Sequence, residues 1–138
     1  MSGFVLDCSI AVTWCFEDEA AAETDALLDL TREEGAVVPR LFALEVANVL
    51  TQAQRHGRMT AADLSARVVL LEALPIVVDD ATASRALHET LALARAEELT
   101  AYDAAYLELA MRYGLPLASR DAALRRSAAR LGVSLLPP

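Results

Sequence analysis

The stretch Phe4-Val5-Leu6-Asp7 decides the fold class, because it is a short apolar run that stops abruptly at an acid. Similar short apolar runs recur along the chain, each bounded by Gly, Pro or a charged residue, which is typical of buried β-strands. The predicted strands are residues 4–6, 36–38, 76–78, 115–118 and 133–136.

Segments with helical periodicity lie between these runs. They are residues 20–33, 41–56, 60–74, 82–97, 102–112 and 122–131. Glycines follow four of these segments where a left-handed C-cap is expected, and Thr60 with Asp63 has the pattern of a helix start. These glycines are Gly35, Gly57, Gly114 and Gly132. Strands that alternate with helices predict a three-layer α/β/α fold, with a mostly parallel sheet of about five strands flanked by helices.

The length of 138 residues suits one domain that spans residues 1–138. Hydrophobic residues make up 55% of the chain, but no apolar stretch is long enough to span a membrane without a charge. Residues 1–7 lack a basic region before an apolar run, so no signal peptide is expected. We therefore expect a cytoplasmic protein with no membrane partner.

Few residues offer nitrogen or sulfur to a metal ion. Cys8 and Cys15 are too few for a disulfide scaffold and are predicted to be buried free thiols, while His56 and His88 lie far from any other such ligand. Any metal ion would therefore be held by oxygen.

The charge pattern excludes several function classes. The net charge of −8 argues against a protein that grips nucleic acid with its whole surface. All twelve cationic residues are arginine, which excludes P-loop, pyridoxal and receiver-type phosphate chemistry, because each requires a lysine. From residue 112 onward the chain has Asp121 as its single acid and carries the cations Arg112, Arg120, Arg125, Arg126 and Arg130. A local basic surface therefore stays possible.

Three acids follow predicted strands or begin predicted helices. Asp7 ends the first strand, Asp121 follows the strand at 115–118, and Asp103 lies near the start of a helix. In an open parallel sheet, ligands bind beyond the carboxyl ends of the strands, so these side chains should converge there.

Glu45 is different, because its helical neighbours are apolar nearly all the way round. We expect it to be partly buried, which requires a cation, an arginine such as Arg40, or a raised pKa as compensation. Asn48 lies on the same helical face and could orient the carboxylate.

Four converging carboxylates would repel one another without a divalent cation. Oxygen ligands favour Mg²⁺ or Mn²⁺, which can activate water and neutralise charge on a phosphate during phosphodiester hydrolysis. Structural roles also remain open: Asp7 as the cap of the turn at 8–11, Asp103 as the partner of a Thr100 cap, and Asp121 as the cap of the last helix.

Four motifs in order, residues 4–9, 45–50, 99–106 and 117–121, resemble a PIN domain of the VapC toxin type over essentially the full chain. The most specific piece is Thr100-Ala101-Tyr102-Asp103. The resemblance implies a homodimeric endoribonuclease that depends on Mg²⁺ or Mn²⁺, cleaves RNA and is inhibited by a VapB-type antitoxin. Alternatives are a pure protein-binding module of this fold and a nuclease directed at DNA.

The resemblance also implies an acidic site of Asp7, Glu45, Asp103 and Asp121. Neighbouring polar positions are Ser9, Asn48, Thr100 and Ser119. The three aspartates would hold the ion, with Glu45 acting through water. Some relatives carry another acid after the last aspartate, whereas this chain has residues Ala122-Ala123-Leu124, so one firmly bound ion is expected.

Two groups of residues have both a functional and a structural interpretation. The arginines at 112, 120, 125 and 126 could contact the RNA backbone or be solvated helix charges. Trp14, Phe16 and Phe42 could form a partner groove, although core packing is the more common role.

Overall fold

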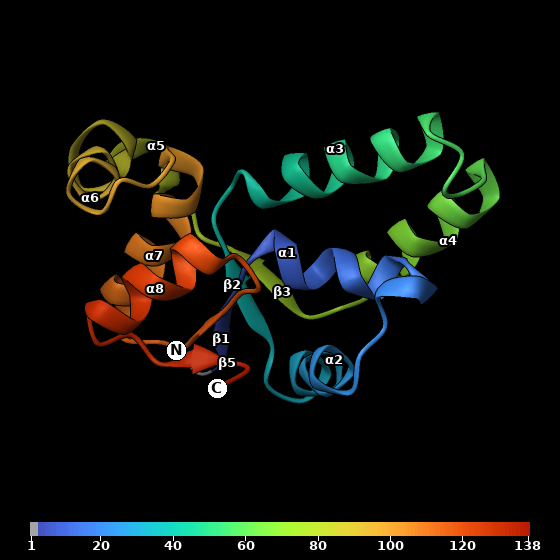
Figure 1. The fold of residues 1–138 in the computed structure, drawn as a ribbon, viewed down its shortest axis with the longest axis horizontal. Coiled ribbons are helices and arrows are strands. Elements are labelled where there is room, and N and C mark those ends of the chain that lie inside the picture. The colour runs from blue at the N-terminus through green and yellow to red at the C-terminus, as the bar shows by residue number, and fades with distance from the viewer. Residues whose placement is uncertain (1–2) are drawn as a thin grey trace.

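The computed structural model describes residues 3–138 and contains a five-stranded parallel sheet in the order β3-β2-β1-β4-β5 (Figure 1). The strands are β1 Phe4–Leu6, β2 Ala36–Val38, β3 Ile76–Val78, β4 Leu117–Ala118 and β5 Leu135–Leu136. Met1 and Ser2, which belong to the segment without a predicted signal peptide, lie outside the described residues. The predicted parallel α/β sheet with flanking helices is confirmed.

The central strand β1 lies fully within the core, since Phe4, Val5 and Leu6 are all at most 1% exposed. Val5 pairs with Val37 of β2 on one side and with Leu117 of β4 on the other. Burial on both faces explains why these strands are continuous apolar runs rather than alternating ones.

Helices surround the sheet, as Figure 1 shows. Their bounds are α1 Cys8–Ala11, α2 Ala22–Glu34, α3 Phe42–Arg55, α4 Ala61–Glu72, α5 Thr82–Arg85, α6 Leu91–Glu97, α7 Ala101–Tyr113 and α8 Ala122–Arg130. Two 3₁₀ turns, Val12–Cys15 and Glu17–Glu19, separate α1 from α2. Helices α3 and α4 project together on one side of the molecule, whereas α5 and α6 lie on the other side (Figure 1).

Three predicted elements differ in detail. The helix expected at residues 82–97 is interrupted by a wide π turn at Ala86–Thr90, which separates α5 from α6. The last two strands are shorter than predicted. Pro116 has no N–H to donate, so the β4 ladder begins at Leu117, although the Pro116 carbonyl still accepts from Val5 N–H at 2.9 Å.

The helix ends agree with the predicted caps. All four predicted C-cap glycines have positive φ angles between 65° and 79°. Thr60 and Asp63 form the predicted reciprocal capping box at the start of α4. At Gly35 the close approach of neighbouring backbone adds a second constraint, because an added Cβ would lie 3.1 Å from the carbonyl oxygen of Pro75.

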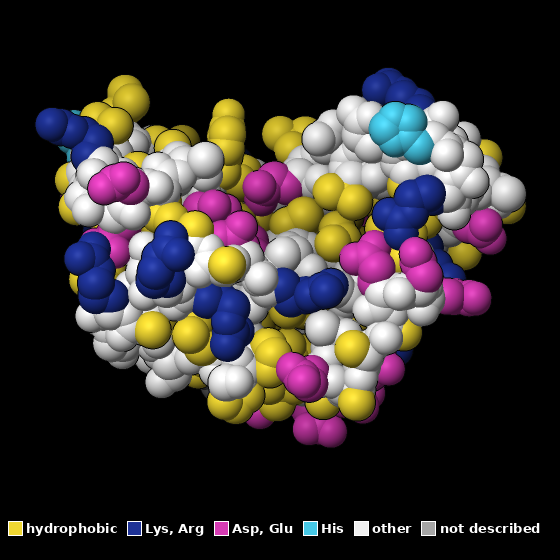
Figure 2. Space-filling view, viewed as in Figure 1, with side chains coloured by type: hydrophobic (Ala, Val, Ile, Leu, Met, Phe, Trp, Pro, Cys, Tyr) yellow, Lys and Arg dark blue, Asp and Glu magenta, His cyan; other side chains and the backbone are white. Residues whose placement is uncertain are grey.

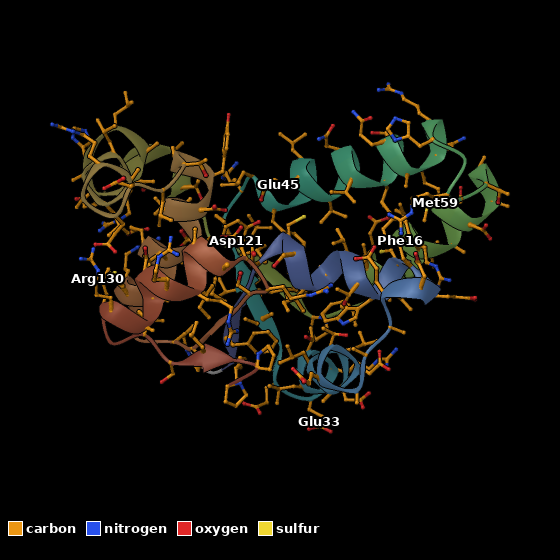
Figure 3. All side chains as sticks on the ribbon, in the orientation of Figure 1. Phe16, Glu33, Glu45, Met59, Asp121 and Arg130 are labelled. Carbon is orange, nitrogen blue, oxygen red and sulfur yellow. The ribbon has the colours of Figure 1, made fainter. Side chains whose placement is uncertain are left out.

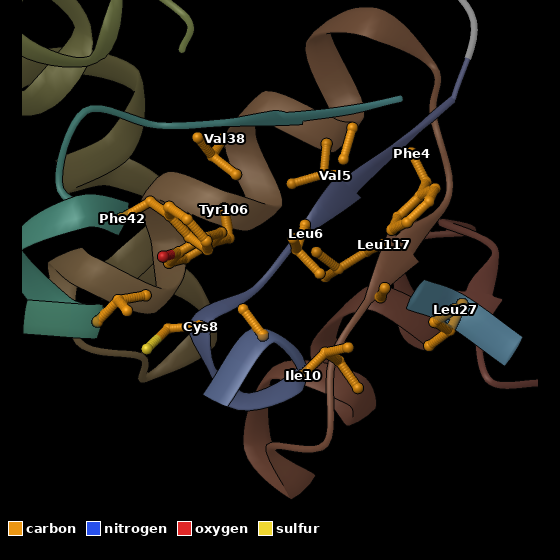
Figure 4. Close-up of a cluster of buried hydrophobic side chains, with 14 of the residues drawn as sticks. Phe4, Val5, Leu6, Cys8, Ile10, Leu27, Val38, Phe42, Tyr106 and Leu117 are labelled. Atoms are coloured by element: carbon orange, nitrogen blue, oxygen red, sulfur yellow. The ribbon is translucent and has the colours of Figure 1, made fainter. Parts of the chain in front are cut away.

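One buried cluster fills the space between the sheet and its helices (Figure 4). Trp14, Phe16 and Phe42 belong to this core, so the structure favours their packing role over a partner groove. Cys8 and Cys15 are buried free thiols, as predicted, and burial raises the pKa of Cys8 to about 12. No helix within residues 3–138 is long and apolar enough to cross a membrane.

Candidate active site

Asp7 lies at the carboxyl end of the central strand and is only 4% exposed. Its Oδ2 atom accepts hydrogen bonds from the hydroxyls of Ser9, at 2.6 Å, and Ser119, at 2.8 Å. Although Asp7 occupies the N-cap position of α1, its side chain makes no capping hydrogen bond. The Asp7 side chain therefore does not cap α1, and two hydroxyl groups hold its carboxylate instead.

The same two serines connect Asp7 to the loop after β4. Ser119 Oγ accepts from the backbone N–H of Asp121 at 3.0 Å, and Ser9 Oγ accepts from that of Arg120 at 2.9 Å. Ser119 is completely buried. The predicted supporting residues Ser9 and Ser119 thus fix the position of one site acid relative to another.

Asp103 and Asp121 lie at the starts of the last two helices. Thr100 caps α7 by accepting from the Asp103 N–H at 3.1 Å, and Asp121 caps α8 by accepting from the Leu124 N–H at 2.8 Å. The capping roles weighed for Thr100 and Asp121 are therefore real. The Asp121 cap occupies Oδ1 and holds the side chain in place at the sheet edge.

Glu45 projects from the first turn of α3 and is partly buried, as predicted. Its surroundings are less apolar than expected, because Leu44 is 76% exposed and Asn48 is exposed as well. Figure 3 labels Glu45 and Asp121 on neighbouring sides of the opening between α3 and α8, and Figure 2 shows acidic side chains gathered in the hollow there.

Three of the four carboxylates have a raised pKa, and the charges of the site acids contribute to each of these shifts. Burial raises the pKa of Asp7 and of Glu45, and it raises the pKa of Asp103 to about 6. The negative charges add to this effect: Asp121 acts on Asp7, Asp7 and Asp103 act on Glu45, and Asp121 and Asp7 act on Asp103. Such mutual repulsion requires the carboxylates to lie within range of one another.

Within residues 3–138, no three His, Cys, Asp or Glu side chains are close enough to form a ready-made ion cage. The donor chemistry nevertheless fits a hard cation. The four acids offer only carboxylate oxygens, and no ion pair in the described part of the chain includes any of them. Asp7, Asp103 and Asp121 are the residues that would hold Mg²⁺ or Mn²⁺, directly or through water.

The four predicted RNA-contacting arginines have different surroundings. Arg112 contacts Asp79 and Glu108, each at 2.8 Å, so its guanidinium is committed to ion pairs within the fold. Arg125 donates to the carbonyl oxygens of Ser119 and Pro137, both at 2.9 Å.

The other two arginines are more accessible. Arg120 is 49% exposed and lies 3.6 Å from Glu19, and Arg126 is exposed on α8. Basic side chains gather over this part of the surface (Figure 2).

Two expectations about Glu45 need correction. Neither Asn48 nor Arg40 bonds to its carboxylate in the described residues; instead, the hydroxyl of Tyr106 donates to Glu45 Oε1 at 2.5 Å. Sequence reasoning missed Tyr106. The available signal was its spacing, since it follows Asp103 by three residues on the same helical face.

A family model and solved structures match this chain. A family model described as PIN domain matches residues 4–129. The crystal structure of PAE2754 from Pyrobaculum aerophilum is similar in fold, with a TM-score of 0.71 and 24% sequence identity over 97% of this chain and 90% of that one. No curated protein sequence matches significantly. The chain belongs to the PIN domain family, whose fold is generally that of metal-dependent nucleases.

Proposed function

We propose that the protein is an endoribonuclease that depends on Mg²⁺ or Mn²⁺. The observation that carries this proposal is the convergence of Asp7, Glu45, Asp103 and Asp121, with no arginine paired to them in residues 3–138 and with burial and mutual repulsion raising the pKa of three. A divalent cation would relieve this repulsion, which gives the site a physical reason to bind one.

Each acid has a distinct role in the proposal. Asp7, Asp103 and Asp121 hold the ion, and the two serines keep Asp7 oriented. Glu45 orients or deprotonates the attacking water, because its raised pKa brings a carboxylate closer to the range of a useful base. When bound, the ion supplies charge neutralisation at the phosphate and a more acidic water. We propose one firmly bound ion, since Ala122, Ala123 and Leu124 offer no further acid.

The exposed arginines supply the proposed contacts to the RNA backbone. Arg120 and Arg126 are the better candidates, since Arg112 is already paired and Arg125 is partly occupied. The resemblance to VapC-type toxins supports a toxin role, a homodimer and a VapB-type antitoxin as further parts of the proposal.

The direct test is cleavage of end-labelled RNA, and of DNA with the same sequence, in Mg²⁺, Mn²⁺ or EDTA. We expect internal cleavage of RNA only with a metal ion, and loss of cleavage in Asp103→Asn. Asp25→Asn is the matched control, because Asp25 is an exposed acid in the first turn of α2.

Two outcomes would contradict the proposal. Equal or preferential cleavage of DNA would make the protein a DNA-directed nuclease. Absence of cleavage and of any metal response would favour a protein-binding module, in which the acids serve only as caps and core groups.

A further inference from the structure

Tyr106 makes a contact that core packing does not explain. Its side chain is completely buried in the main cluster, yet its hydroxyl donates to Glu45 Oε1 at 2.5 Å, across 61 positions of sequence. Figure 4 shows the ring inside the buried cluster with its oxygen turned toward α3. A phenylalanine would fill the same space, so the hydroxyl itself requires an explanation.

The direction of this hydrogen bond is fixed by chemistry. An ionised carboxylate can only accept, so the phenol is the donor. Hydrogen bonds to a charged group are short and strong, and the 2.5 Å separation agrees with that class. One carboxylate oxygen of Glu45 is therefore held in place, and the side chain loses the freedom that an exposed glutamate on a first helical turn would have.

The position of Tyr106 on α7 adds a second consequence. It follows Asp103 by one helical turn, so both side chains project from neighbouring positions on the same face. The hydrogen bond therefore fixes the position of the Glu45 side chain on α3 relative to Asp103 on α7, although α3 and α7 are distant in sequence.

We infer that Tyr106 is a positioning residue for Glu45: its hydroxyl holds Oε1, so that the other carboxylate oxygen can act on the attacking water. This inference rests on the proposed function, because it assigns Glu45 a task at the attacking water. A group that supports a catalytic side chain in this way commonly affects activity by about 10- to 100-fold.

The test is a double-substitution cycle of Tyr106→Phe and Glu45→Gln. Tyr106→Phe should lower kcat for RNA by about 10- to 100-fold with KM unchanged, and should cause no further loss in the Glu45→Gln background. Tyr102→Phe is the matched control and should leave kcat unchanged, because Tyr102 lies on the same helix but is 64% exposed. An unchanged kcat in Tyr106→Phe, or an equal loss in both backgrounds, would overturn the inference.

Urea unfolding of the same four proteins gives a readout independent of activity. The two substitutions should be coupled, so that the double variant is less destabilised than the sum of the single ones. If the wild-type protein cleaves no RNA, the proposed function fails, but this cycle still decides whether Tyr106 holds Glu45. Additive effects on stability would overturn the inference even in an active enzyme.

Discussion

Asp7 and Asp79 occupy equivalent places in the fold but have opposite electrostatics. Each directly follows a parallel strand, β1 or β3, and their exposures are 4% and 6%. Burial raises the pKa of Asp7, whose partners are neutral hydroxyls. Arg112 lowers the pKa of Asp79 through two hydrogen bonds, and Tyr113 donates a third.

This difference separates an acid that is paired within the fold from one that we propose binds a metal ion. Arg112 contacts both Asp79 and Glu108, and Arg85 also contacts Glu108, so two arginines balance the two acids on the β3 side of this edge. The part of the edge around Asp7 has negative charge in excess, which either protonation or an added cation would relieve, and the raised pKa values show this repulsion. Position after a strand is therefore a weak criterion for a metal-binding acid. The charge of the residues that contact the acid is the better criterion.

The largest expected effect is on activity. Asp7→Asn should lower RNA cleavage by at least about 100-fold, because in the proposed mechanism Asp7 is a ligand of the ion that neutralises charge at the phosphate. Stability should be little changed or increased, since the substitution removes a repelling charge. Asp79→Asn should leave kcat nearly unchanged and should lower the free energy of unfolding, because it weakens the ion pair with Arg112. Equal activity losses in the two variants would contradict the distinction between Asp7 as a metal ligand and Asp79 as an acid paired within the fold.

Next in size is the effect of Arg112→Met on folding. It leaves the buried Asp79 without a cation and Glu108 with Arg85 alone, which should cost about 3 kcal/mol of unfolding free energy in urea titrations. Arg95→Met is the control, because Arg95 is an exposed residue of α6 and its loss should cost less than about 0.5 kcal/mol. A cost for Arg112→Met as small as that of the control would show that this edge does not depend on the ion pairs.

A smaller effect is expected in the pH dependence of stability without metal. The pKa of Asp103 is about 6 in the folded protein against 3.8 as the ordinary value, so the folded state binds more protons in this window. Stability should therefore fall as pH rises from about 4 to 6, by about 1 to 2 kcal/mol after allowance for solvent screening. Asp79 acts in the opposite sense, because its lowered pKa makes its stabilisation disappear as pH falls below about 4.

Thermal unfolding in EDTA across pH 4 to 7 measures this effect. The fall should be smaller in Asp103→Asn than in the wild-type protein, and a fall of the same size in both would show that Asp103 is not repelled by its neighbours.

The sequence predicted the fold well because its signals are local. The apolar runs, the glycines at helix ends and the Thr60–Asp63 cap act within a few residues, and all appear where predicted except that the last two strands begin later. The π turn at Ala86–Thr90 was missed because a five-residue widening leaves the apolar periodicity of the segment almost unchanged.

The site was harder to predict because its contacts join distant segments. The four acids were found from their places after strands or in early helical turns. The same rule cannot tell Asp7 from Asp79, since no local feature reveals that Arg112, 33 residues from Asp79, completes an ion pair. Tyr106 escaped prediction for the same reason, as its partner lies on another helix. The RNA role of the arginines remains a prediction. Of the four, only Arg120 and Arg126 are exposed to solvent, where they could contact a phosphate.

The most direct test of the central claim is a Mn²⁺ titration followed by thermal unfolding of the wild-type protein, Asp7→Asn and Asp79→Asn at neutral pH. We predict that the wild-type protein and Asp79→Asn gain stability as Mn²⁺ rises, by about 2.7 kcal/mol at a concentration 100 times the Kd, whereas Asp7→Asn gains far less. Absence of stabilisation in the wild-type protein, or an equal gain in Asp7→Asn, would contradict the claim that the unbalanced acids form a metal site.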